Sequence, residues 1–278
     1  MSFTSHYLTC AGRELHYTEW GAGNDETVIA WHGLARTCRD MDDIAAHLSQ
    51  RYRVICPDTI GRGLSQWSPA PEREYCLAFY EQLAVSLVDG LGLTQFHWLG
   101  TSMGGAIGTR AAARGLHGRV LRLVLNDNGP ELAAAAIARI RGYAGNPSAF
   151  DTVSELEAYF RVVYKPYGAL SDDQWRRLTE TSTRRLPDGR VTPHYDPAMV
   201  MQFTHHADEY LQWDDWERLD IPVLCLRGES SDLLLPDVAE KMRSTGPCAI
   251  VVEIKDCGHA PALNTPAQWA LVERFLAG

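Results

Sequence analysis

A serine flanked by glycines carries the clearest chemical signal in the chain. Residues 99–105 (LGTSMGG) fit the pattern G-x-S-x-G and continue the apolar run 96–99. That run is typical of a buried strand, and residues 106–114 are rich in good helix formers. A sharp strand-to-helix turn between them would expose the hydroxyl of Ser102 beside the free N–H groups at the start of the helix. Ser102 is therefore the candidate nucleophile.

A serine hydroxyl is a weak nucleophile near neutral pH, so it needs a base, which is usually histidine. Of the ten histidines, His259 stands directly after the last predicted strand, in residues 256–261 (DCGHAP). The loops beyond the carboxyl ends of parallel strands meet at one edge of the sheet, so a base placed there can reach Ser102. We predict that His259 is this base.

The base in turn needs a carboxylate that orients its ring. Asp232 follows the predicted strand 223–226 and gives the chain order Ser, Asp, His, so we predict that it is the acid. Asp127 follows the preceding predicted strand of the sheet and is the alternative, with a turn residue as its other interpretation. Asp256 is close to His259 in sequence but would have to fold back to reach it.

The stretch His32-Gly33-Leu34 ends a predicted strand that should neighbour the strand before Ser102. A glycine at that point lets the backbone turn an N–H group toward the serine. We therefore predict an oxyanion hole made by the backbone N–H groups of Leu34 and Met103. His32 is interpreted as a structural residue that shapes this loop.

Together these motifs resemble the α/β-hydrolase superfamily, in the branch that has a serine nucleophile and a helical cap. The resemblance rests on residues 32–33 (HG), 58–65 (DTIGRGLS), 100–105 (GTSMGG), 228–232 (GESSD) and 258–261 (GHAP). It covers nearly the whole chain and implies an α/β fold with a mostly parallel eight-stranded sheet flanked by helices. The superfamily includes esterases, lactonases and C–C hydrolases, so the resemblance does not name the substrate.

Strand and helix patterns alternate up to Pro130, as they do in a parallel α/β sheet. Residues 131–219 then contain several helical patterns and many large aromatic side chains but no good strand run, and the alternation resumes at residue 223. We therefore expect an α/β-hydrolase core formed by residues 1–130 and 220–278, with residues 131–219 inserted as a helical cap over the site.

The composition is that of an ordinary globular protein, with 45% hydrophobic and 22% charged residues. A net charge of −9 without a dominant Lys or Arg cluster argues against a nucleic-acid or membrane-surface partner. Residues 1–10 lack the basic start and apolar core of a secretory signal, and no apolar run is long enough to span a bilayer, so we expect a cytoplasmic protein. The seven cysteines lack C-x-x-C spacing and are expected to be reduced thiols, and nothing in the sequence indicates an oligomeric state.

The chemistry assigned to Ser102 requires neither a metal nor an organic cofactor, and we expect none. His205, His206 and Asp208 form the one cluster that invites a metal-site interpretation. They lack the i, i+4 spacing that places two ligands on one face of a helix, so we do not predict a metal site there.

The substrate pocket is expected to be lined by side chains of the cap and of the loops around Ser102. The candidate lining residues are Arg36, Trp67, Tyr143, Tyr159 and Trp175. The aromatic residues indicate a substrate with apolar bulk, although aromatic side chains at helical spacing are more often core residues. Arg36 stands two residues after Leu34 and is a candidate to bind a substrate carboxylate, with a solvent-exposed surface arginine as the alternative.

We predict a serine hydrolase that cleaves a small carboxylic ester or lactone through an acyl-enzyme on Ser102. The resemblance leaves a hydrolase of C–C bonds in a vinylogous diketone as an alternative, although such enzymes often carry Trp where this chain has Ala260. A second alternative is a non-catalytic ligand receptor on the same fold, against which a complete triad argues. Haloalkane dehalogenases and epoxide hydrolases use an aspartate as the nucleophile, so Ser102 disfavours their chemistry.

Overall fold

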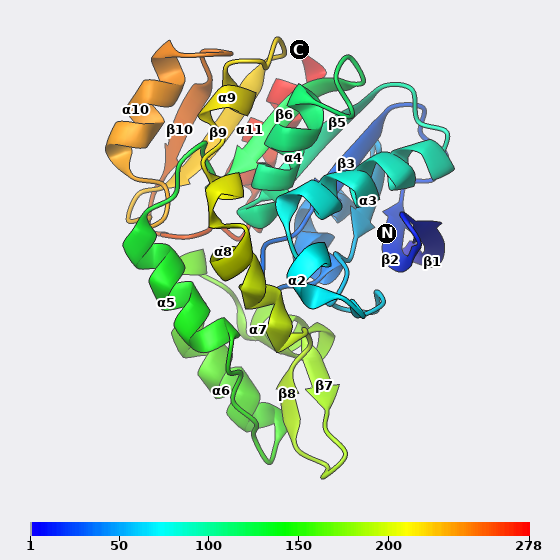
Figure 1. Ribbon diagram of the computed structural model, residues 1–278, viewed down its shortest axis with the longest axis vertical. Coiled ribbons are helices and arrows are strands. Elements are labelled where there is room, and N and C mark those ends of the chain that lie inside the picture. Colours follow the sequence, from blue (N-terminus) through cyan, green and yellow to red (C-terminus); the bar gives the residue numbers. More distant parts are fainter. Residues whose placement is uncertain (1) are drawn as a thin grey trace.

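An eight-stranded sheet forms the centre of the computed structural model, which describes residues 2–278 (Figure 1). Its strands lie in the order β1-β2-β4-β3-β5-β6-β9-β10. Their bounds are β1 Phe3–Cys10, β2 Arg13–Trp20, β3 Thr27–Trp31, β4 Arg53–Pro57, β5 Phe96–Thr101, β6 Val120–Asn126, β9 Val223–Gly228 and β10 Ile250–Ile254. The pairs β1–β2 and β2–β4 are antiparallel and the other neighbours are parallel. The predicted mostly parallel eight-stranded sheet is therefore confirmed.

The central strands are buried because helices cover both faces of the sheet. Every residue of β3 is buried, and in β5 only Thr101 is partly exposed. One face packs against α3 (Leu77–Gly90), α4 (Met103–Ala113) and α10 (Pro236–Ser244), and the other against α1 (Asp42–Leu48) and α11 (Pro266–Ala277). Continuous apolar runs without alternation are the pattern that such doubly covered strands require. The short α2 (Pro71–Glu74) and the 3-10 turn η1 (Cys38–Met41) complete this part of the chain.

The parallel strands all end at the same edge of the sheet, so the loops that follow them meet there. Leu34 follows β3, Ser102 follows β5 and Asp127 follows β6. Residues 229–232 follow β9, and His259 lies in the loop after β10. Residues that are up to 225 positions apart in the sequence, from Leu34 to His259, are thereby gathered at one place.

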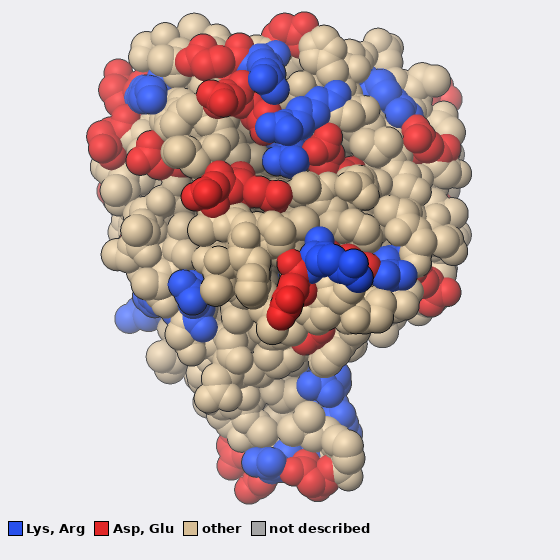
Figure 2. All heavy atoms as spheres, in the orientation of Figure 1, with Lys and Arg blue, Asp and Glu red and all other residues tan. Residues whose placement is uncertain are grey.

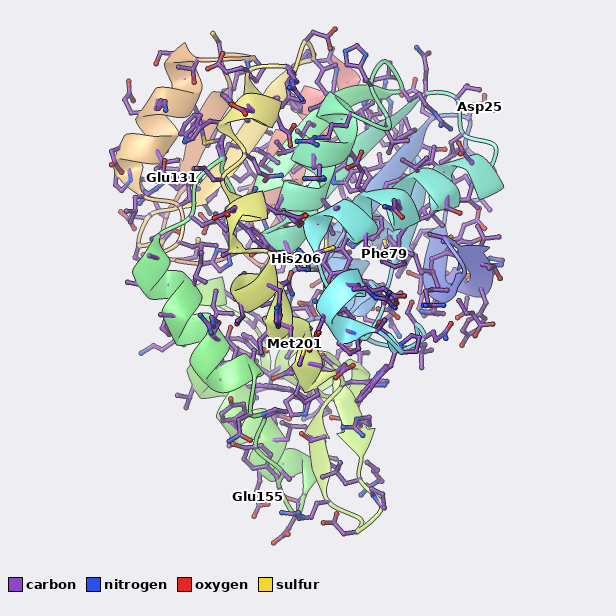
Figure 3. The ribbon with its side chains drawn as sticks, in the orientation of Figure 1. Asp25, Phe79, Glu131, Glu155, Met201 and His206 are labelled. Atoms are coloured by element: carbon purple, nitrogen blue, oxygen red, sulfur yellow. The ribbon has the colours of Figure 1, made fainter. Side chains whose placement is uncertain are left out.

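Residues 134–193 of the segment between β6 and β9 lie beyond this edge of the sheet (Figure 1). The helices and strands of the whole segment are α5 (Ala134–Ala144), α6 (Val153–Val163), α7 (Asp172–Thr181), β7 (Thr183–Arg185), β8 (Val191–Pro193), α8 (Gln202–His205) and α9 (Trp213–Trp216), with 3-10 turns η2 (Lys165–Tyr167), η3 (Pro197–Met201) and η4 (Ala207–Tyr210). Figure 3 labels Glu131 where the segment leaves the core and Glu155 near its far end. Leu156, Phe160 and Trp175 belong to an apolar cluster of this segment's own, which favours treating it as a cap.

Two details of this segment differ from the predicted helical cap. The strands β7 and β8 form an antiparallel hairpin, whose three-residue strands are too short to give a strand pattern in the sequence. The last helix, α9, belongs with the core, because Gln212 donates to the carbonyl of Ala106 (2.9 Å) and Asp215 pairs with Arg114 (2.7 Å) on α4. The division at residues 131 and 219 stays a prediction.

Charged side chains of both signs are mixed over the face of the molecule in Figure 2, and neither sign forms a large continuous patch there. Within residues 2–278, no helix has the length and apolar character needed to cross a membrane.

Candidate functional site

Ser102 sits at a sharp turn between β5 and α4, with backbone angles φ 52° and ψ −116°. Two glycines make this turn possible, because side chains at their positions would collide with the backbone. A Cβ atom on Gly100 would lie 2.2 Å from the carbonyl oxygen of Gly104, and one on Gly104 would lie 2.2 Å from that of Trp31. The predicted strand-turn-helix arrangement around Ser102 is thus present, and its positive φ marks local backbone strain of the kind that gathers at functional sites.

His259 connects the serine hydroxyl to a buried carboxylate. Its Nε2 atom lies 2.9 Å from Oγ of Ser102, and its Nδ1 atom lies 2.7 Å from Oδ2 of Asp127. The Asp127 side chain is fully buried, whereas the imidazole is 13% exposed. A proton on Nδ1 that is donated to Asp127 leaves Nε2 free to accept the Ser102 hydroxyl proton. This is the protonation pattern that a general base needs.

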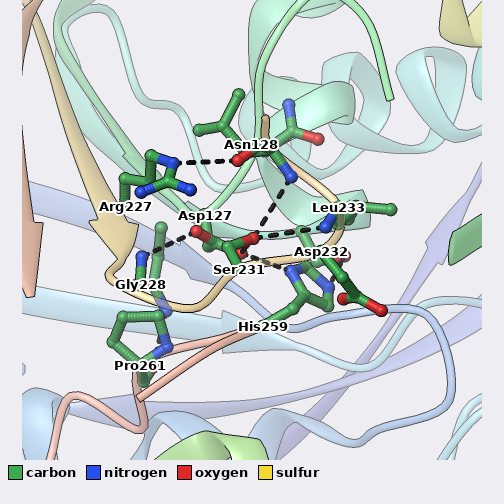
Figure 4. Close-up of polar contacts among 12 residues, drawn as sticks. Asp127, Asn128, Arg227, Gly228, Ser231, Asp232, Leu233, His259 and Pro261 are labelled. Carbon is green, nitrogen blue, oxygen red and sulfur yellow. Dashed lines mark hydrogen bonds and ion pairs between the residues drawn. The ribbon is translucent and has the colours of Figure 1, made fainter. Parts of the chain in front are cut away.

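The prediction that Asp232 is the partner of His259 is wrong. The Asp232 side chain is 53% exposed, and its carboxylate accepts hydrogen bonds from Nε (3.0 Å) and Nη2 (2.7 Å) of Arg139. Asp127, the alternative, occupies the position beside the imidazole (Figure 4). Both loops lie at the same edge of the sheet. Both aspartates also come between Ser102 and His259 in the chain, so the order Ser, Asp, His does not distinguish them. Asp256 is exposed in the turn after β10 and makes no bond with His259.

The loop after β9 holds the Asp127 carboxylate instead of supplying one. The N–H of Gly228 donates to Oδ1 of Asp127 (2.8 Å), and the hydroxyl of Ser231 donates to Oδ2 (2.6 Å), as Figure 4 shows. The N–H of Leu234 donates to Oγ of Ser231 (3.2 Å), which directs the hydroxyl proton of Ser231 to Asp127. These roles of Gly228 and Ser231 were not predicted, although both residues lie in the motif 228–232.

The two predicted oxyanion donors come from the loop after β3, which carries Leu34, and from the start of α4, which carries Met103. Met103 is the first residue of α4, so its N–H has no acceptor within the helix. Across residues 2–278, neither this N–H nor that of Leu34 donates a hydrogen bond to protein. The fully buried Arg62 bridges the two residues, since its Nε donates to the carbonyl of Leu34 (2.9 Å) and its Nη2 lies 3.5 Å from Sδ of Met103. Arg62 belongs to the motif 58–65, and the sequence analysis did not single it out.

His32 holds the loop that carries Leu34, as predicted. Its Nδ1 donates to the carbonyl of Gly33 (2.6 Å), and its Nε2 accepts from the N–H of Thr59 (2.9 Å). Complete burial of the ring lowers the pKa of His32 to about 4, against smaller opposing effects of Asp58 and of the bond to Gly33. The ring is therefore neutral at physiological pH, which its acceptor role toward Thr59 requires.

A pocket whose lining includes Ser102 and His259 lies between the core and the cap. Of the predicted lining residues, Arg36 and Tyr143 line it. Arg36 is only 3% exposed, so the alternative of a solvated surface arginine is wrong. Further lining residues, which were not predicted, come from the cap and are Arg139, Ile140, Val163, Tyr164, Pro166 and Tyr167.

The other three predicted pocket residues lie elsewhere. Trp67 is 38% exposed and lies under the guanidinium of Arg184, whose central carbon is 4.9 Å from the ring. Tyr159 packs against Phe150, with ring centres 5.2 Å apart, and Trp175 is buried in the cap cluster. The pocket lining therefore does not include Trp67, Tyr159 or Trp175, because each of these side chains packs against other residues of the protein.

A potential metal-ligand group in residues 2–278 is formed by His16, Cys38 and Asp58. The Nδ1 atom of His16 is 2.7 Å from Oδ2 of Asp58, which is a hydrogen-bond distance. Two ligands on one tetrahedral zinc ion lie about 3.3 Å apart, given bonds of about 2.0 Å. His16 and Asp58 are therefore arranged as a hydrogen-bonded pair and not as two ligands of one zinc ion. A second group contains Cys76, His206 and Glu209, but Nε2 of His206 is bound to the carbonyl of Glu72 (2.7 Å).

Comparisons with known proteins show the family of this fold. A family model described as "alpha/beta hydrolase fold" matches residues 26–266. The chain is 38% identical to the 3-hydroxybutyrate-oligomer hydrolase of Cupriavidus necator, over 94% of this chain and 92% of that protein. It is 28% identical to the N-formylmaleamate deformylase of Pseudomonas putida, over 91% and 88% of the two chains. The crystal structure of an alpha/beta hydrolase from Novosphingobium aromaticivorans has a TM-score of 0.86 and 30% identity, over 99% of this chain and 98% of that one.

Proposed function

This chain belongs to the alpha/beta hydrolase family, and we propose that it is a serine hydrolase that cleaves a small carboxylic ester or lactone through an acyl-enzyme on Ser102. The observation that carries the proposal is the hydrogen-bonded series from Ser102 through His259 to Asp127. Asp127, rather than Asp232, takes the role of the acid in this proposal.

The first half-reaction begins when Nε2 of His259 accepts the hydroxyl proton of Ser102. The serine oxygen attacks the ester carbonyl carbon, and the N–H groups of Leu34 and Met103 stabilise the oxyanion that forms. In comparable sites each such donor contributes roughly 10²–10³ in rate, or about 3–4 kcal/mol. The imidazolium then gives its proton to the departing alkoxide, which leaves as the alcohol, and the acyl group stays on Ser102.

In the second half-reaction, His259 accepts a proton from water, and the hydroxide oxygen attacks the acyl carbon. The bond to Ser102 breaks, and the imidazolium returns the proton to the serine oxygen, so that the free acid leaves and the enzyme is restored. Asp127 stabilises each imidazolium through Nδ1. A lactone follows the same route, with its alcohol and acid remaining in one molecule.

The substrate we favour is an ester of a short hydroxy acid. The relative from Cupriavidus necator, 38% identical over nearly the full length of both chains, is named for hydrolysis of 3-hydroxybutyrate oligomers. The units of such oligomers are joined by ester bonds, which is the bond class the proposed chemistry cleaves.

A fluorophosphonate probe tests the nucleophile. We expect it to label the wild-type protein at Ser102 and to leave Ser102→Ala unlabelled. Ser230→Ala is the control, because Ser230 lies in the loop after β9 and donates only to the carbonyl of Cys257 (3.0 Å). Absence of labelling in the folded wild type would contradict the proposal and favour a ligand receptor on this fold.

A substrate panel then tests the reaction. It contains p-nitrophenyl acetate, the linear dimer of 3-hydroxybutyrate, a short-chain lactone and a dienoic diketone. We expect the wild-type protein to hydrolyse the esters and the lactone, and we expect Ser102→Ala to hydrolyse none of them. Higher kcat/KM for the diketone than for any ester would overturn the ester assignment in favour of C–C hydrolysis.

A further inference from the structure

Arg36 is buried and rigidly held beside the catalytic pocket. Its Nε and Nη2 atoms donate to the two carboxylate oxygens of Asp40 (2.6 and 2.7 Å), and Nη2 also donates to the hydroxyl of Ser182 (2.9 Å). The rings of Tyr164 and Phe160 lie 4.5 and 5.6 Å from the central carbon of the guanidinium. These contacts fix the plane of the guanidinium and use three of its five N–H groups.

The remaining nitrogen of this guanidinium has no partner. Nη1 of Arg36 is buried, and no atom within residues 2–278 accepts a hydrogen bond from it. A buried charged donor without an acceptor is rare in folded proteins because its desolvation is not offset. Arg36 also lines the pocket that contains Ser102 and His259. A ligand that reaches this side chain from the pocket would supply an acceptor for Nη1.

The pocket lining offers a ligand two arginine side chains, those of Arg36 and Arg139, and no carboxylate, and the aspartates that pair with these arginines lie outside the lining. Arg139 lies at the exposed side and is already paired with Asp232, so Arg36 has the free donor. Burial raises the pKa of the hydroxyls of Tyr143 and Tyr167, so both stay protonated and can donate as well.

We propose that Nη1 of Arg36 binds a carboxylate of the substrate, so that the preferred substrates are esters that carry a free carboxylate. The inference rests on the proposed function, because it names the substrate class of the same pocket. Because Asp40 and Ser182 hold Nε and Nη2, the two N–H groups of Nη1 keep a fixed direction and can donate charge-assisted hydrogen bonds to a carboxylate. A linear oligomer of a hydroxy acid ends in such a group.

Matched substrates test this in the wild-type protein without any substitution. The linear dimer of 3-hydroxybutyrate carries a free carboxylate, and its methyl ester does not. We expect kcat/KM at least 10-fold higher for the free acid, mostly through KM, which is the usual size of one charge-assisted hydrogen bond. We also expect 3-hydroxybutyrate to inhibit hydrolysis of p-nitrophenyl acetate competitively, at a concentration at least 10-fold lower than its neutral amide.

Substitutions then assign the preference to one side chain. Arg36→Gln should abolish the preference for the free acid, and Arg36→Lys should keep part of it. Because Arg36→Gln leaves Asp40 without its partner, the double variant Arg36→Gln/Asp40→Asn and thermal unfolding serve as checks of folding. Arg110→Gln is the matched control, since Arg110 is another largely buried arginine that is paired with a carboxylate, that of Glu81 (2.7 Å).

The outcomes separate this inference from the proposed function. If wild type hydrolyses p-nitrophenyl acetate but shows no preference for the free acid and no selective inhibition, the carboxylate site is refuted while the serine hydrolase stands. If the preference persists in folded Arg36→Gln, another residue recognises the carboxylate and the assignment to Arg36 is refuted. Failure of every ester and of the fluorophosphonate probe refutes the hydrolase and the carboxylate site together.

Discussion

The Nδ1 atom of His259 lies 2.7 Å from Oδ2 of Asp127, while the Asp232 carboxylate is bound to Arg139. The carboxylate that faces the imidazole therefore comes from the loop after β6. The loop after β9 contributes the N–H of Gly228 and the hydroxyl of Ser231 to the same carboxylate. Two loops thus share the task of presenting one buried negative charge to the imidazole.

Replacement of Asp127 is expected to disable catalysis. In Asp127→Asn a neutral amide replaces the carboxylate. The amide does not stabilise the imidazolium, and it allows the unproductive tautomer of His259. We expect kcat for p-nitrophenyl acetate to fall by roughly 10³–10⁴. Asp232→Asn is the matched control and should keep kcat within about threefold, with a loss of unfolding free energy of at most ~1 kcal/mol from its exposed ion pair. A larger loss of kcat in Asp232→Asn than in Asp127→Asn would contradict the assignment.

Ser231 is expected to act as a positioning residue through Asp127. Removal of its hydroxyl in Ser231→Ala takes one donor from the carboxylate, which then attracts the proton of the imidazolium more strongly. We expect kcat to fall by about 10-fold with KM nearly unchanged, and the acidic limb of the kcat/KM pH profile to move to higher pH. Ser230→Ala should leave both unchanged. An acidic limb that stays in place, or moves to lower pH, would refute the role of Ser231.

Gly104 is expected to tolerate no side chain. A Cβ atom there would lie 2.2 Å from the carbonyl oxygen of Trp31, so Gly104→Ala must displace backbone next to Ser102. We expect a loss of about 1–3 kcal/mol in unfolding free energy, together with reduced kcat. In Gly142→Ala, within α5, the new Cβ meets nothing within 4 Å, so this control should be stabilised by up to ~1 kcal/mol. Denaturant titrations measure both values, and equal effects of the two substitutions would argue against the close approach at Gly104.

The neutral, buried His32 is expected to make stability depend on pH. Its pKa is lowered to about 4 in the folded chain, against about 6.5 in the unfolded chain. Between these values the unfolded chain takes up a proton that the folded chain does not, so the stability that His32 contributes is present above pH 6.5 and is lost as the pH falls toward 4. The difference in unfolding free energy between wild type and His32→Asn should therefore decrease by up to ~3 kcal/mol over this range. A difference that grows as the pH falls would contradict the lowered pKa.

Much of the fold could be predicted because its signals are local. The doubly buried strands carry continuous apolar runs, and the turn at Ser102 needs glycines at positions 100 and 104, which no other residue type can replace without a collision. The sequence also placed His259 at the end of the last strand, from which it reaches Ser102. The hairpin β7–β8 was not predicted because strands of three residues are too short to repeat the two-residue alternation of a β-strand.

The pocket lining was harder to predict, because it depends on which face of a cap helix is turned toward Ser102. Tyr143 and Tyr159 looked alike in the sequence, yet only Tyr143 lines the pocket, while Tyr159 packs against Phe150. For Arg36 the sequence allows either a role in binding substrate or a place on the surface. The side chain is held inside the protein by hydrogen bonds to Asp40 and to Ser182, which is 146 residues away in the sequence.

The sequence by itself determined the sheet, the turn that exposes Ser102 and the meeting of Ser102 with His259, because short-range patterns and parallel strand order are sufficient for these. Only the tertiary structure decided which aspartate completes the series. Asp127 and Asp232 lie in the loops after two neighbouring strands, β6 and β9, and both come between Ser102 and His259 in the chain. The choice depends on the positive φ of 55° at Asp127 and on the donors of Gly228 and Ser231, which exist only once β6 and β9 are paired.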